Sequence, residues 1–102
     1  MKLSLLKIKE GKLETWKEWG NLLMTKYKDE AIETLKEEGL IYECFCVFEI
    51  DGNHYTLAMI EGEEEPTNMD RELNQKHRAT KKKCLEKIGP VEKVYELYNN
   101  SK

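Results

Sequence analysis

Hydrophobic positions are densest in residues 40–61, where two apolar runs, LIYECFCVFEI and YTLAMIE, flank the tetrapeptide DGNH. Gly and Asn tolerate the positive φ angles of tight turns, so the segment Asp51-Gly52-Asn53 predicts a β-hairpin. The first run is apolar at odd and even positions alike, and a strand of this kind is covered on both faces. One layer of helices covers only one face, so something else must cover the other.

A long helical pattern precedes the hairpin. Residues 2–9 predict a first strand, which Gly11 ends. Apolar residues then recur at steps of three and four from Leu13 onward, as on one face of a helix. Gly39 stands where a glycine is expected just after a helix. The pattern is long for a small domain, and we expect a bend at Gly20-Asn21.

A second helical pattern follows the hairpin. Its apolar stripe runs from Met69 to Ile88 and includes His77. Thr67 or Asn68 is a suitable N-cap, and Gly89-Pro90 is expected to end the helix.

The remaining residues complete one domain. Residues 91–98 (VEKVYELY) predict the last strand, and residues 99–102 a frayed tail. Residues 1–98 then have the order β-α-β-β-α-β, a ferredoxin-like α+β fold with a four-stranded antiparallel sheet and two helices on one face. The uncovered face is too apolar to remain in water. A homodimer whose two sheets stack face to face would cover it.

Composition excludes several classes of partner. The net charge is −3, and the 36% of charged residues are interspersed. Lys81-Lys82-Lys83 is the only basic run, which argues against nucleic acid. Membrane spans need about 18–20 apolar residues, and no such run or secretory signal is present. The three cysteines favour reduced thiols and a cytoplasmic location.

Three segments resemble a family of uncharacterised small bacterial domains in the dimeric α/β-barrel superfamily. They are WKEWGNLL, DEAIETLKEEGLIYECF and HRATKKKCLE, and together they extend over most of the chain. The positions that carry the resemblance are Trp16, Trp19, Glu30, Thr34, Leu35, Glu43 and His77. The resemblance implies the fold and the dimer but no activity, because the superfamily includes oxygenases, haem-degrading enzymes, mutarotases and binding modules.

Two polar residues interrupt apolar surfaces and are candidates for chemistry. His77 lies on the apolar stripe of the second helix, and Glu43 lies between Ile41 and Phe45 on a strand. An imidazole titrates near neutrality, and a buried carboxylate needs a partner. One interpretation is a catalytic pair in which Glu43 orients His77 as a general base. The other is a core histidine, with Glu43 paired to a basic residue of the first strand or of a second copy. Strand parity does not choose the face that carries Glu43.

A pocket between sheet and helices is the expected ligand site. Trp19, Tyr42 and Phe45 are the predicted ligand-binding residues. A small organic molecule held there would undergo proton transfer, as in mutarotation or cofactor-free oxygenation. The alternative is a non-catalytic dimeric binding or regulatory module. The sequence leaves open which of these two classes applies and which ligand is bound.

No metal and no cofactor are predicted. Cys44 and Cys46 project to the same face of a strand, but C-x-C within a strand lacks the spacing of zinc sites. Buried cysteines of this kind behave as small hydrophobic residues. Motifs for nucleotide binding, serine hydrolases and zinc proteases are also missing from the sequence.

Overall fold

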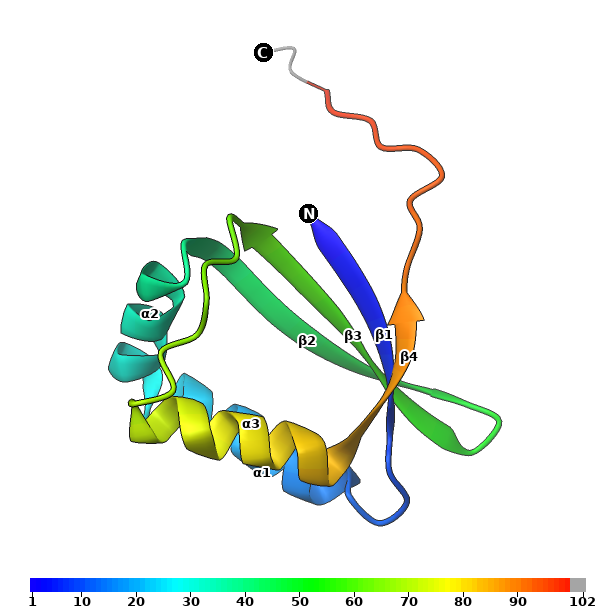
Figure 1. The fold of residues 1–102 in the computed structure, drawn as a ribbon. Helices are drawn as coiled ribbons and strands as arrows, with labels where there is room; N and C mark the ends of the chain where they lie inside the picture. The colour runs from blue at the N-terminus through cyan, green and yellow to red at the C-terminus, as the bar shows by residue number, and fades with distance from the viewer. Residues whose placement is uncertain (100–102) are drawn as a thin grey trace.

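A computed structural model describes residues 1–99 of the chain and shows a four-stranded antiparallel sheet with three helices on one face (Figure 1). The elements are β1 (Lys2–Ile8), α1 (Leu13–Met24), α2 (Lys28–Glu37), β2 (Leu40–Ile50), β3 (Asn53–Gly62), α3 (Glu72–Cys84) and β4 (Leu85–Pro90). The strand order is β2-β3-β1-β4. The predicted ferredoxin-like α+β fold is therefore confirmed, with two helices rather than one in the first crossover. The expectation of a frayed tail falls, beyond Asn99, outside the described residues.

The hairpin of β2 and β3 is confirmed in detail. Its two-residue loop consists of Asp51 and Gly52, with φ angles of 51° and 80°. Two consecutive positive φ angles are typical of the primed turns that match the twist of a hairpin. The register pairs Ile50 with Asn53 next to the loop and continues without a break to Tyr42, where a β-bulge follows.

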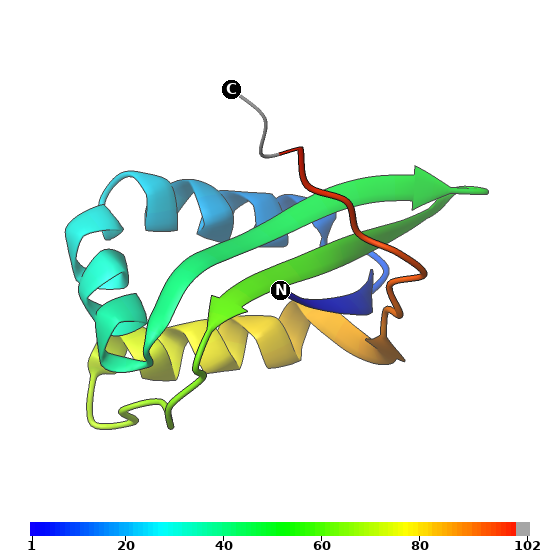
Figure 2. The ribbon, with the colours of Figure 1, turned by 90° about the horizontal axis from the view of Figure 1, so that it is seen from above.

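The expected bend at Gly20-Asn21 was wrong, because the long helical pattern breaks later. Gly20 lies within α1, and the chain leaves the helical conformation at Thr25 (φ −125°, ψ −88°). The Thr25 hydroxyl donates to the carbonyl of Asn21 at 2.7 Å, a local bond that competes with helix continuation. Figure 2 shows α2 turned across the end of α1, toward the start of β2.

The predicted boundaries of the second helix were also wrong. Helix α3 begins at Glu72 rather than near Met69. The Asn68 side chain accepts from the backbone N–H of Asp70 at 3.0 Å, which forms a turn before the helix instead of a cap. The helix ends at Cys84, and Leu85 is already extended (φ −119°, ψ 146°).

The last strand is Leu85–Pro90, and the strand predicted for residues 91–98 is not formed. Leu85 pairs with Ile8 and Pro90 with Ser4, so pairing with β1 overrides the helical periodicity that continues to Ile88. Pro90 is tolerated because β4 is an edge strand. The N–H of Val91 still donates to the carbonyl of Leu3 on β1 at 3.0 Å. The residues that follow, up to Asn99, extend away from the sheet on the side opposite to the helices (Figure 1).

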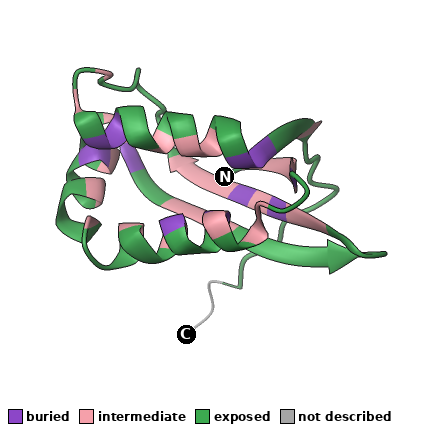
Figure 3. Cartoon of the chain, turned by 90° about the horizontal axis from the view of Figure 1, so that it is seen from below, coloured by how far each residue is buried: buried purple, intermediate pink, exposed green. Residues whose placement is uncertain are grey.

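The core lies between the helices and one face of the sheet. Its buried residues are Ile8, Trp16, Trp19, Leu73, Cys84 and Leu85. In Figure 3 the outer surfaces of the helices are largely exposed, while buried positions lie where helices and strands meet. Phe45 packs edge-on against Trp16, with ring centroids 5.5 Å apart. Phe45 and the β2 residues of the same parity therefore face the helices.

The other face of the sheet is apolar, and no helix within residues 1–99 covers it (Figure 2). Alternation along β2 and the register with β3 and β1 define the residues on this side, which also carries Lys7, Ile50 and Glu61 near the strand ends. We call the following nine residues the open face: Leu3, Leu5, Tyr42, Cys44, Cys46, Phe48, Tyr55, Leu57 and Met59. The stacked rings of Phe48 and Tyr55, 5.6 Å apart, confirm that both side chains lie on one side.

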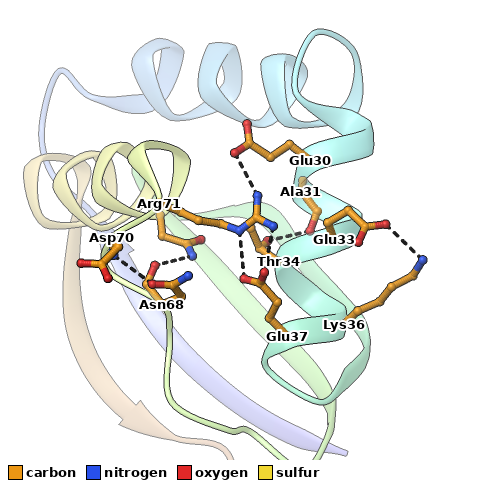
Figure 4. A network of polar contacts seen from close by, with 10 residues as sticks. Glu30, Ala31, Glu33, Thr34, Lys36, Glu37, Asn68, Asp70 and Arg71 are labelled. Atoms are coloured by element: carbon orange, nitrogen blue, oxygen red, sulfur yellow. Dashed lines mark hydrogen bonds and ion pairs between the residues drawn. The ribbon is translucent and has the colours of Figure 1, made fainter.

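An arginine links α2 to the start of α3 (Figure 4). Arg71 donates to both carboxylate oxygens of Glu37 at 2.9 and 2.8 Å, and to Glu30 at 3.2 Å. The hydrogen bond from Arg71 lowers the pKa of the Glu37 carboxyl below its ordinary value. Planar bidentate pairing of this kind fixes orientation, so it sets the direction in which α3 runs over the sheet.

Candidate functional site

A cavity of about 810 Å³ lies between the sheet and the three helices. Helices α1, α2 and α3, strand β2 and the segment that follows β3 all contribute to its wall. Its aromatic lining consists of Trp16, Trp19 and Phe45, and its polar lining includes Glu43, Asn74 and His77. A mostly apolar cavity with a few convergent polar groups is the usual form of a small-molecule site.

Three side chains from three elements form a line at the wall of this cavity. The indole Nε1–H of Trp19 on α1 donates to Nδ1 of His77 on α3 at 2.9 Å. The other ring nitrogen of His77, Nε2, lies 3.7 Å from Oε1 of Glu43 on β2. The side chains of His77 and Glu43 remain 21% and 24% exposed. They are therefore neither fully buried nor free in solvent, and a ligand in the cavity can reach them.

The charge state of Glu43 follows from its surroundings. Burial by itself would raise the pKa of the Glu43 carboxyl, but the neighbouring His77 and Lys81 lower the pKa below its ordinary value. The carboxyl is therefore ionised near neutrality. An ionised carboxylate is a strong acceptor for a ligand hydroxyl or amine.

The structure brings four of the five predicted site residues together. Glu43, Phe45, Trp19 and His77 all line the cavity. Tyr42 lies outside it: the side chain is 44% exposed and belongs to the open face. Alternation along β2 explains this separation, since neighbouring residues of a strand point to opposite faces.

Sequence reasoning missed polar residues of α3 that also line the cavity, among them Asn74 and Lys81. In the sequence, Lys81 stands out only as part of the basic run Lys81-Lys82-Lys83. Its spacing from His77 is four residues, and that of Asn74 is three, so all three share one side of the helix. This spacing is the signal that could have identified them.

Other chemistry has little support in the described part of the chain. Within residues 1–99, no group of three or more His, Cys, Asp or Glu side chains is arranged to hold a metal ion. The cysteines there are free. None of the described helices combines the length and the apolar character needed to span a membrane.

Comparison with protein families identifies the family of the chain. A family described as Family of unknown function (DUF6176) matches residues 1–100. The chain belongs to this family. The comparison with curated proteins found no match.

A solved structure shares the fold of this DUF6176 protein. It is the crystal structure of an L-rhamnose mutarotase from Formosa agariphila, with a TM-score of 0.52 and 17% sequence identity. The alignment covers 96% of this chain and 99% of the mutarotase chain. At this identity the similarity establishes the fold alone.

Proposed function

We propose that this DUF6176 protein is a homodimer that binds a small, uncharged, hydroxyl-bearing molecule in the cavity between sheet and helices, and that it catalyses proton transfer there. The observation that carries the proposal is the pair of Glu43 and His77, 3.7 Å apart at the wall of an 810 Å³ cavity. A carboxylate held beside an imidazole on the wall of a cavity is typical of a proton-transfer site.

The charge balance of the cavity favours an uncharged ligand. Its four acidic lining residues, Glu38, Glu43, Glu64 and Glu65, are matched by four basic ones, Lys17, Lys28, Arg78 and Lys81. A balanced lining does not concentrate anions or cations. The aromatic rings of Trp16 and Phe45 supply apolar surface, and the Glu43 carboxylate supplies an acceptor for a hydroxyl group.

Mutarotation of a sugar is one reaction that a single carboxylate can support. The carboxylate takes the proton of the anomeric hydroxyl, the carbonyl forms, and the ring C–O bond breaks. The ring oxygen, released as an alkoxide, then takes the same proton back from the carboxyl group. Closure on the other face of the carbonyl reverses these steps, so no outside acid, base or cofactor is consumed. The fold shared with an L-rhamnose mutarotase supports this choice.

The dimer is supported by two apolar surfaces on the same side of the molecule. The open face carries nine apolar, aromatic or cysteine side chains. Residues 91–99 extend from the sheet on that side and expose Val94, Tyr95, Leu97 and Tyr98, at 92, 79, 84 and 76%. Exposed patches of this extent usually mark interaction sites. A two-fold related copy covers both surfaces with the same residues of its own.

The function is tested by following the interconversion of the α and β anomers of L-rhamnose by NMR, with a panel of other aldoses alongside. We expect the wild-type protein to accelerate interconversion of at least one sugar and Glu43→Ala to lose the acceleration. Binding without acceleration would instead identify a non-catalytic binding module. No binding and no acceleration across the panel would contradict the proposed ligand class.

A further inference from the structure

The hydrogen bond between Trp19 and His77 determines which nitrogen of the imidazole carries the proton. An indole N–H is only a donor, so Nδ1 of His77, 2.9 Å away, must present its lone pair. The two rings are inclined by only 26°, with centroids 6.0 Å apart. The ring planes are thus nearly parallel.

The single proton of the neutral imidazole is therefore on Nε2. That nitrogen is the one nearest to Glu43, 3.7 Å from Oε1. Nδ1 accepts from Trp19, and the protonated Nε2 lies on the side of the Glu43 carboxylate. A histidine in this state has no lone pair left with which to take a proton from a ligand.

The carboxylate of Glu43 can take a proton from a ligand, which His77 in this state cannot. Only its Oε1 is directed toward His77. The second oxygen, Oε2, accepts no hydrogen bond from any residue in the described part of the chain. The side chain is 24% exposed at the cavity wall, so this oxygen is available to a ligand.

We propose that Glu43 is the catalytic residue that contacts the ligand, that His77 is a positioning residue whose Nε2–H faces Glu43, and that Trp19 fixes the tautomer of His77. This order reverses the one expected from the sequence, in which Glu43 orients His77 as the base. The catalytic role of Glu43 rests on the proposed function. The tautomer of His77 does not, because it is a property of the protein without ligand.

The tautomer is measured directly by ¹⁵N NMR of histidine-labelled wild-type protein at neutral pH. We expect one protonated and one unprotonated ring nitrogen, with Nδ1 unprotonated and the Trp19 indole N–H protected from exchange. A protonated Nδ1, or an unprotected indole, would overturn the assignment without any variant being made.

Two tryptophans on one helix supply a matched pair of variants. Trp19→Phe removes the donor to His77, and we expect the two tautomers of His77 to become mixed. Trp16→Phe also removes an indole N–H, but from a ring that packs on Phe45. His77 should therefore keep one tautomer in this variant. Equal behaviour of the two variants would show that Trp19 only packs.

Conservative variants separate the roles of Glu43 and His77. Gln at position 77 retains an N–H donor but no titrating group, so His77→Gln should retain most of the sugar binding or turnover that His77→Ala loses. Glu43→Gln should lower sugar binding or turnover more than tenfold. The opposite ranking, with His77→Gln inactive and Glu43→Gln active, would overturn the assignment. A fixed tautomer without binding of any sugar would leave the assignment of His77 intact and reject the proposed ligand instead.

Discussion

The two faces of the sheet are built from similar residues but differ in where charge is placed. On the covered face of β2, Glu43 lies beside Phe45 at the wall of the cavity. On the open face of the same strand, Cys44, Cys46 and Phe48 follow one another without a charge. Both faces need a cover. The charged residues that the register places on the open side, Lys7, Glu61 and Glu86, lie on β1, β3 and β4 rather than on β2. Under the proposed function, the charge between apolar residues of β2 marks the face that binds a ligand, and the apolar run on the other side of β2 marks the face that a second copy covers.

The largest expected effect comes from placing a charge at the centre of the open face. Leu57 lies on β3 between Cys46 of β2 and Leu5 of β1. Burying an unpaired carboxylate costs several kcal/mol, so Leu57→Glu should weaken the dimer by roughly a thousandfold. Sedimentation at micromolar concentration should show a dimer for wild type and a monomer for the variant.

Leu22→Glu is the matched control, because Leu22 is an exposed residue of α1, outside the open face. This variant should remain dimeric. A wild-type protein that is a folded monomer at micromolar concentration would contradict the assignment of the open face.

Truncation of one aromatic residue on each face compares their contributions to stability. Trp16 is only 6% exposed, so Trp16→Ala should lower the free energy of unfolding by about 3–5 kcal/mol at any protein concentration. Tyr55→Ala acts on the open face, and its loss of stability should grow with protein concentration as dimerisation contributes more. Urea denaturation at two concentrations measures both. A loss for Tyr55→Ala that does not depend on concentration would indicate that the open face does not associate.

The reactivity of the cysteines tests the same difference between the covered face and the open face. Cys84 has 0% exposure in the core, whereas Cys46 is exposed and Cys44 is half-buried on the open face. Cys84 should react with a thiol reagent only on unfolding. Labelling of Cys44 and Cys46 should be slow in the dimer and should become faster on dilution. Fast labelling at every concentration would argue that the open face is not covered.

The smallest effect concerns the carboxylate of the covered face. The folded-state pKa of Glu43 lies below its ordinary value of 4.5. A lowered carboxyl pKa stabilises the fold above the unfolded value, and this contribution is lost as the pH falls through the folded pKa. Thermal unfolding of wild type should therefore lose stability relative to Glu43→Gln below about pH 4.5, by about 1 kcal/mol or less. A difference that stays constant with pH would mean that His77 and Lys81 do not stabilise the charge.

The features that the sequence predicts well are local. The loop of Asp51 and Gly52 requires positive φ angles at adjacent residues, and the residue types alone indicate it. Strand β4 is different, because Leu85 extends the apolar stripe of α3 and becomes a strand only through its pairing with Ile8. The end of α1 likewise depends on the Thr25 side chain rather than on a glycine.

The candidate site was predictable in part of its members but not in its arrangement. Glu43 and His77 stand out as polar residues within apolar patterns. The side of β2 on which Glu43 lies depends on how Phe45 packs against Trp16, which is a tertiary contact. The bond from Trp19 to His77 joins residues 58 positions apart, and neither helix pattern signals it.

The most direct test of the division between the two faces is a ¹H–¹⁵N NMR titration of the wild-type protein with L-rhamnose, repeated for any aldose of the panel that binds. The account predicts shifts at the Trp19 indole N–H and at the amides of Glu43, Phe45 and His77, with none at Leu57 and Tyr55. Shifts confined to the open face, with the Trp19 indole unchanged at saturation, would contradict it.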